Sequence, residues 1–141
     1  MALIGGGGAG NVAGGANPSG TGSGLNYIGN YVYAYSGTYV ADNASHTVID
    51  FTSGTELIKA EIKINGAVNP TTSSVAGTNG QIKFDSQTIG AGPTSTALDA
   101  QYYYSEKVII PPFTRVQVLI NFYETDSNDI ATALITGEIV G

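Results

Sequence analysis

Apolar and polar residues alternate with a period of two along most of the chain beyond its first 25 residues. The clearest stretch is LIKAEIKING, in which charged residues separate the apolar positions Ile58, Ala60, Ile62 and Ile64. This period places alternate side chains on opposite faces of a β-strand. We therefore predict a half-buried strand here, with Ile62 in the core.

Similar runs recur to the end of the chain. They are NYVYAYSGTYV, HTVIDF, QIKFDSQTI, EKVII, TRVQVLINFYE and IATALITGEIV. EKVII ends at Pro111-Pro112, which cannot donate to a ladder and so ends a strand. The predicted buried positions of the last two runs are Val116, Val118, Ile120 and Phe122, and Ala131, Ala133, Ile135 and Ile139. No run has the 3.6-residue period of a helix.

Turn-forming residues separate these runs and define the fold class. The predicted turns are Ser53-Gly54, Asn65-Gly66, Asn79-Gly80, Gly90 to Pro93 and Ser127-Asn128. About seven or eight short strands with frequent turns indicate an all-β protein, a single β-sandwich of jelly-roll type. A closed barrel is the alternative.

The first residues, MALIGGGGAGNVAGGANPSGTGSG, form a different region, with ten glycines and no charge. We place a glycine-rich arm at residues 1–25 and the sandwich at 26–141. Glycine loses much backbone entropy on ordering and adds no side chain to a core, so if this arm is ordered, a partner must supply the contacts. The residues we expect at that contact are Leu3, Ile4, Gly5, Gly6, Gly7, Gly8 and Val12.

Charge and composition exclude several functions. Charged residues make up 11% of the chain and the net charge is −6, whereas an ordinary soluble domain has roughly 25% charged residues. Five scattered Lys and Arg residues argue against nucleic acid as a partner. No stretch is long and apolar enough for a membrane span, and the absence of cysteine excludes disulfides and thiolate chemistry.

Candidate catalytic and metal-binding residues are few. Gly5, Gly7 and Gly10 match GxGxxG, but a dinucleotide site also needs a strand before the motif, a helix after it and an acidic residue about twenty positions on, and the sequence predicts none of these. His46 is the only histidine, and we expect it solvated at the start of a strand. The cluster Asp126, Asn128 and Asp129 is typical of a turn. We predict no enzyme, no cofactor and no metal.

Tyrosine is the more informative residue, because the chain has nine tyrosines, four phenylalanines and no tryptophan. Tyr31, Tyr33 and Tyr35 share one strand face, and Tyr102 and Tyr104 share another just before the predicted strand 105–110. Such rows either stack on sugars or pack against protein. The absence of tryptophan favours packing and a protein interface.

The stretches LNYIGNYVYAYSGTYV, TELIKAEIKING and VIIPPFTRVQVLINF, after a glycine-rich arm, resemble small β-sandwich structural proteins of tailed bacteriophages, those that decorate or cement the capsid exterior. The resemblance implies a homotrimer, an arm that reaches the shell or a neighbour, and no catalytic residue. Fibre-tip proteins of such virions are also β-sandwiches.

These observations lead to a hypothesis of function. We expect a non-enzymatic protein on the capsid surface, bound to the major capsid protein or other virion subunits and to copies of itself. The start MALIGGGG lacks the basic region of a secretory signal, so we expect synthesis in the host cytoplasm. The alternatives are a fibre-knob, glycan- or receptor-binding module, and a self-assembling surface or pilus-like subunit.

Overall fold

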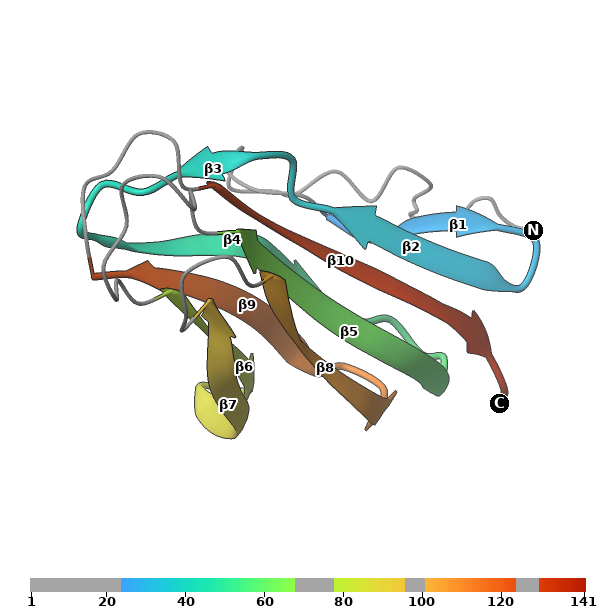
Figure 1. Cartoon of the computed structure of the whole chain (residues 1–141). Helices are drawn as coiled ribbons and strands as arrows, with labels where there is room; N and C mark the ends of the chain where they lie inside the picture. The colour runs from blue at the N-terminus through green and yellow to red at the C-terminus, as the bar shows by residue number, and fades with distance from the viewer. Residues whose placement is uncertain (1–23, 68–77, 96–100, 124–129) are drawn as a thin grey trace.

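Two antiparallel β-sheets stack face to face in the computed structural model, which describes residues 24–67, 78–95, 101–123 and 130–141 (Figure 1). The first sheet has the order β1-β2-β10-β5-β8, with β3 also paired to β10, and the second has the order β4-β9-β6-β7. The strands are β1 (Asn26–Ile28), β2 (Tyr31–Tyr35), β3 (Tyr39–Val40), β4 (Ser45–Thr52), β5 (Ile58–Ala67), β6 (Thr78–Phe84), β7 (Gln87–Ser95), β8 (Gln101–Ile110), β9 (Arg115–Phe122) and β10 (Ile130–Ile139).

The strand order is that of a jelly roll. The strands β2, β10, β5 and β8 form one four-stranded layer, and β4, β9, β6 and β7 form the other. From β4 onward the chain crosses between the layers at every connection except the β6–β7 hairpin, which is the connectivity of a double-sheet jelly roll. The predicted all-β jelly-roll sandwich is therefore confirmed, with β1 and β3 as two short additional strands. No helix of the described residues is long and apolar enough to cross a membrane.

The core lies between the two sheets and follows the predicted alternation. On β5, the side chains of Ile58, Ala60, Ile62 and Ile64 all point inward and are buried. On β9, the buried side chains are Val116, Val118, Ile120 and Phe122. On β10, Ala131, Ala133 and Ile135 are buried and Ile139 packs against the core. The predicted core positions, Ile62 and Val118 included, are confirmed.

Three predicted turns are wrong, because their glycines lie inside strands. Asn65-Gly66 is part of β5, Asn79-Gly80 is part of β6, and Gly90 to Pro93 is part of β7. A side chain at Gly80 would overlap Ile64 of the opposite sheet, and one at Gly92 would lie 2.5 Å from the Tyr104 ring. These glycines are needed where the two sheets approach closely, which is a known role of glycine within strands.

The stretch QIKFDSQTI is a hairpin rather than one strand. β6 ends at Phe84 and β7 begins at Gln87, so Asp85 and Ser86 form a two-residue turn. Both have positive φ, 50° and 70°, which is the backbone of a type I′ turn. The backbone N–H of Arg115 donates to Asp85 Oδ1, which holds this turn against β9. The alternation of apolar and polar residues continues through the turn, so the sequence did not predict a turn here.

The described part of the chain begins at Gly24, just before β1. Leu25 is buried in the core, and Asn26 starts the first strand. β1 runs antiparallel to β2 through a turn at Gly29, whose φ is +60°. The predicted arm residues Leu3, Ile4, Gly5, Gly6, Gly7, Gly8 and Val12, and the cluster Asp126, Asn128 and Asp129, lie outside the described residues.

Tyr27 on β1 gives the fold a defined response to alkaline pH. Burial raises the pKa of Tyr27 to about 12, and the neighbouring Glu56 carboxylate adds to the shift. Because the folded-state pKa lies above the unfolded value near 10, the protonated phenol stabilises the fold fully below pH 10. We expect this contribution to be lost between pH 10 and about 12, and Tyr27→Phe to flatten that part of the stability curve in chemical denaturation. A wild-type curve that matches Tyr27→Phe over this range would contradict the assignment.

Candidate functional site

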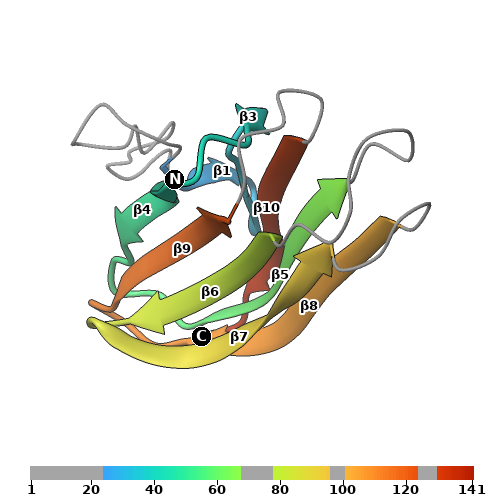
Figure 2. The same cartoon turned by 60° about the vertical axis from the view of Figure 1, so that its left-hand side comes forward.

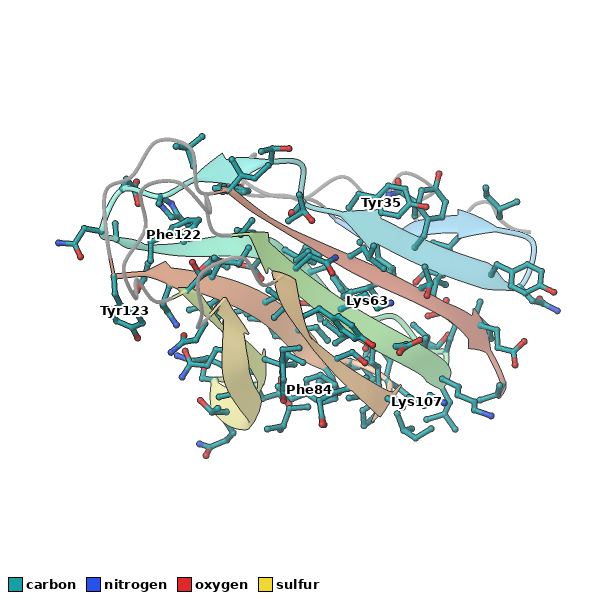
Figure 3. The ribbon with its side chains drawn as sticks, in the orientation of Figure 1. Tyr35, Lys63, Phe84, Lys107, Phe122 and Tyr123 are labelled. Carbon is teal, nitrogen blue, oxygen red and sulfur yellow. The ribbon has the colours of Figure 1, made fainter. Side chains whose placement is uncertain are left out.

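The solvent side of the first sheet, here called the outer face, is built from alternate residues of four adjacent strands. The strand register fixes which residues share this face. They are Tyr31, Tyr33 and Tyr35 of β2; Leu134, Thr136 and Glu138 of β10; Lys59, Glu61 and Lys63 of β5; and Tyr103, Ser105, Lys107 and Ile109 of β8. In Figure 3 the labelled residues Tyr35, Lys63 and Lys107 come from β2, β5 and β8 of this sheet.

Exposed hydrophobic side chains are concentrated on this side of the molecule. Eleven large hydrophobic residues of the described chain are exposed, and seven of them belong to the outer side of the first sheet. They are Ile28, Tyr31, Tyr35, Val40, Tyr103, Ile109 and Ile130. A concentration of exposed apolar side chains on one side of a molecule is a feature of interaction sites.

The solvent side of the second sheet is different in chemistry. On this side Asn121 Nδ2 donates to Asn79 Oδ1 over 2.7 Å. The Arg115 guanidinium donates to both carboxylate oxygens of Asp50, at 3.1 and 2.8 Å. These polar groups already satisfy one another within the chain. Of the two sheets, the first is therefore the one with the features of a binding surface.

Basic residues also gather on the outer face. Lys59, Lys63 and Lys107 are three of the chain's five basic residues, and they alternate with Glu61 and Glu138. The Lys63 ammonium nitrogen lies 4.9 Å from the centre of the Tyr103 ring, within cation–π range. The face therefore carries a small positive excess on a chain whose net charge is −6.

Two adjoining hollows mark the outer face, each about 500 Å³ in volume. The first lies between Tyr31 and β8, and its side-chain walls include Lys59, Lys107 and Ile109. The second continues across β2, and its lining includes Ile28 and Tyr35. Tyr31 lines both hollows and is 65% exposed, so its ring stands between them.

The predicted tyrosines do not all lie on this face. Tyr31, Tyr33 and Tyr35 do, and the ring centres of Tyr33 and Tyr35 are 5.2 Å apart. Strand β8 begins at Gln101, earlier than the predicted strand 105–110, so the tyrosines lie inside the strand. The side chain of Tyr102 lies outside the described part of the structure. The role of the predicted tyrosines in an interface stays a prediction.

Tyr104 belongs to the packing at the edge where β7 and β8 meet (Figure 2). Its ring lies against Gly90 and Gly92 of β7, neither of which leaves room for a side chain. Burial raises the pKa of the Tyr104 phenol, and Glu106 adds to the shift. Tyr103 is exposed, and sequence reasoning missed it. The position of Tyr103 follows from its pairing with Asn65 of β5, which the sequence alone does not reveal.

His46, expected to be solvated, is instead held by neighbours. Its Nε2 lies 2.8 Å from an Asp42 carboxylate oxygen, and its side chain is 29% exposed. The ring packs between Tyr39 and Phe122, with ring centres 5.4 and 5.9 Å away. The described residues hold no group of three or more His, Asp or Glu side chains placed to bind a metal ion.

Comparison with known proteins gives only distant structural likenesses. No protein-family description matches the sequence, and no curated protein matches it. The VP2 subviral particle protein of infectious bursal disease virus is 6% identical, with a TM-score of 0.46 over 81% of this chain and 34% of its own. The insecticidal delta-endotoxin Cry8Ea1 of Bacillus thuringiensis is 9% identical, with a TM-score of 0.42 over 74% of this chain and 19% of its own.

A third similar structure is the CBM36-1 domain of a multidomain xylanase from the hindgut metagenome of Trinervitermes trinervoides. It is 12% identical, with a TM-score of 0.42 over 87% of this chain and 94% of its own. This chain thus spans about a third of the virus protein and a fifth of the toxin. The likenesses concern the β-sandwich fold, which viral capsid proteins and other proteins share.

Proposed function

We propose that this chain is a non-enzymatic structural subunit of a virion, of the type that decorates or cements a tailed-phage capsid. The observation that carries the proposal is the outer face, where a jelly-roll sheet leaves most of the exposed large hydrophobic residues of the described chain uncovered. Jelly rolls serve many functions, so the fold alone does not decide among them. A tyrosine-rich face with exposed apolar side chains supports assembly with other protein.

The charge distribution of the chain supports a location on the outer surface of the capsid. A coat protein that packs nucleic acid through its terminus needs a basic arm, and residues 1–24 contain no Lys or Arg. His46, the only histidine, packs against two aromatic rings and an aspartate, so it has a structural role. The partners in this proposal are the major capsid protein or other virion subunits.

The glycine-rich arm is the attachment element in this proposal. Glycine allows close backbone approach, so the arm can add to an exposed sheet edge or lie in a groove of another protein. Ordering it costs on the order of 1–2 kcal/mol per residue in backbone entropy. Few apolar side chains offset that cost, so a rigid protein surface must supply backbone hydrogen bonds.

Deletion of residues 1–24 tests the attachment. We expect the shortened chain to melt within about 2 °C of the full chain, because a loss of less than 0.5 kcal/mol moves the melting temperature by no more than about this amount. We expect its binding to capsid particles that lack the protein to fall at least about tenfold, measured by co-sedimentation. Equal binding by the two chains would show that the arm is not the anchor. If the full chain does not bind such particles either, the proposed function is wrong.

A glycan-binding module is the second candidate, and the hollow beside Tyr31 favours it. An exposed ring there is flanked by Lys59, Lys107 and Glu138, which offer hydrogen-bond donors and acceptors around an apolar wall. A glycan array probed with the full chain and with Tyr31→Ala separates the two functions. A glycan signal that Tyr31→Ala removes would support this candidate over the structural role.

A further inference from the structure

The residues of the outer face form rows that run across the strands of the sheet. One row reads Tyr31, Glu138, Lys59 and Ile109 across β2, β10, β5 and β8. The next row reads Tyr33, Thr136, Glu61 and Lys107 across the same strands. In these two rows the end positions and the middle positions are complementary in chemistry, whereas the third row, Tyr35, Leu134, Lys63 and Ser105, places an apolar and a charged residue in the middle.

The first row pairs an exposed aromatic ring at one end with an exposed aliphatic side chain at the other. Its middle positions carry opposite charges, on Glu138 and Lys59. In the second row, a tyrosine and a lysine occupy the ends, and a hydroxyl and a carboxylate occupy the middle. Consider a rotation by 180° about an axis that runs parallel to the strands, between β10 and β5. It exchanges the two end residues of each row, and it also exchanges the two middle residues.

We propose that a second copy of this chain packs on the outer face about this two-fold axis, in place of the homotrimer that the resemblance implies. Glu138 of each copy then lies opposite Lys59 of the other, and Tyr31 lies opposite Ile109. Tyr33 meets Lys107 in a cation–π contact, and the Thr136 hydroxyl donates to the Glu61 carboxylate. A two-fold interface uses the same patch on both copies, so it needs this kind of self-complementarity.

The shape of the face agrees with the same pairing. The Tyr31 ring stands beside the hollow whose walls include Lys59 and Ile109. The rotation places Tyr31 of one copy over the Ile109 side of that hollow in the other copy. Twisted sheets that stack face to face cross at about 30°, which keeps the two central strands in contact. Those strands, β10 and β5, carry the Glu138–Lys59 pair.

The extent of the face indicates a weak dimer. Four strands about 4.8 Å apart, with outward residues about 7 Å apart along each strand, make a patch of roughly 400–500 Å² in projection. A standard interface buries about 800 Å² of accessible surface on each partner, so this patch is smaller than a standard interface. The dimer should therefore dissociate on dilution. The inference does not depend on a location in the virion.

Reversing the charges of Lys59 and Glu138, which face each other across the axis, tests the dimer. Sedimentation velocity of the full chain should show a concentration-dependent monomer–dimer equilibrium. Lys59→Glu alone, or Glu138→Lys alone, places like charges opposite each other and should weaken dimerisation about tenfold or more. The double variant restores opposite charges across the axis, so its dissociation constant should return to within about threefold of wild type. Lys83→Glu, on the second sheet, should leave it unchanged.

Three results would overturn the inference. The first is a wild-type chain that stays monomeric at the highest soluble concentration or forms a trimer. The second is a dimer that neither single reversal weakens, and the third is a double variant no tighter than the singles. Urea denaturation of each variant, run at a concentration where the chain is monomeric, identifies any loss caused by misfolding. Failure of capsid binding would leave the dimer test unaffected.

Discussion

Replacing Gly137 with alanine should lower the free energy of unfolding by about 3 kcal/mol or more, or prevent folding. Gly137 lies in β10, between β2 and β5. A Cβ there would lie 2.5 Å from the Lys59 carbonyl oxygen and 2.8 Å from the Ala60 Cα atom. These are backbone atoms of a central strand, which cannot move aside without breaking the β10–β5 ladder. Urea denaturation followed by circular dichroism measures the loss.

Gly141→Ala is the matched control for that change. A Cβ at Gly141 would meet Leu57 at 3.5 Å, an ordinary van der Waals contact, so we expect a change within about 0.5 kcal/mol. If Gly137→Ala is as stable as Gly141→Ala, the close approach of β10 and β5 at this position is wrong.

Truncation of Ile62 to alanine should cost about 2–5 kcal/mol and lower the melting temperature by roughly 10 °C. Ile62 is fully buried in the middle of β5 and points at the second sheet. The loss combines the transfer free energy of the removed carbon atoms with the cavity that they leave. Thermal denaturation by differential scanning calorimetry measures it.

Leu119→Ala compares the same kind of truncation on the other side of a strand. Leu119 is half-buried, on the solvent side of β9, so its loss should be less than half that of Ile62→Ala. Equal losses at the two positions would contradict the assignment of the faces.

Strand identity and facing were predictable here because burial on one side of a sheet imposes a period of two. β5 and β9 show this plainly: every predicted core position in them is buried. The jelly-roll strand order is less accessible, since it depends on pairings such as Ile62 with Ile135 across a long sequence separation. Alternation shows which side of a strand is apolar, but it does not identify the neighbouring strand.

Turns were predicted less well than strands, and glycine is the reason. A glycine in sequence signals either a turn or a close approach between sheets, and Gly80 and Gly92 are of the second kind. Conversely, the hairpin at Asp85-Ser86 contains no glycine although both residues have positive φ. Local composition cannot distinguish these cases, because the opposing residue, Ile64 or Tyr104, comes from another strand.

One part of the candidate site, the tyrosine row of β2, was predictable from the sequence. The row Tyr31, Tyr33 and Tyr35 was identified from its own alternation. Alternation alone does not place Tyr103 on the solvent side of β8, whereas its register with Asn65 of β5 does. The distribution of lysines and glutamates over the outer face was also inaccessible, since Lys107, Glu61 and Glu138 become neighbours only through pairing of distant strands.

Covalent labelling of tyrosines tests most directly whether the outer face is the assembly surface. The full chain is nitrated when free and dilute, and again when bound to capsid particles, and modification is read by peptide mass spectrometry. We predict that Tyr31, Tyr35 and Tyr103 react in the free chain and become protected on assembly. Tyr123, 61% exposed and outside the outer face, reports the reactivity of the free chain. Unchanged labelling of Tyr31, Tyr35 and Tyr103 in the assembled protein would contradict the account.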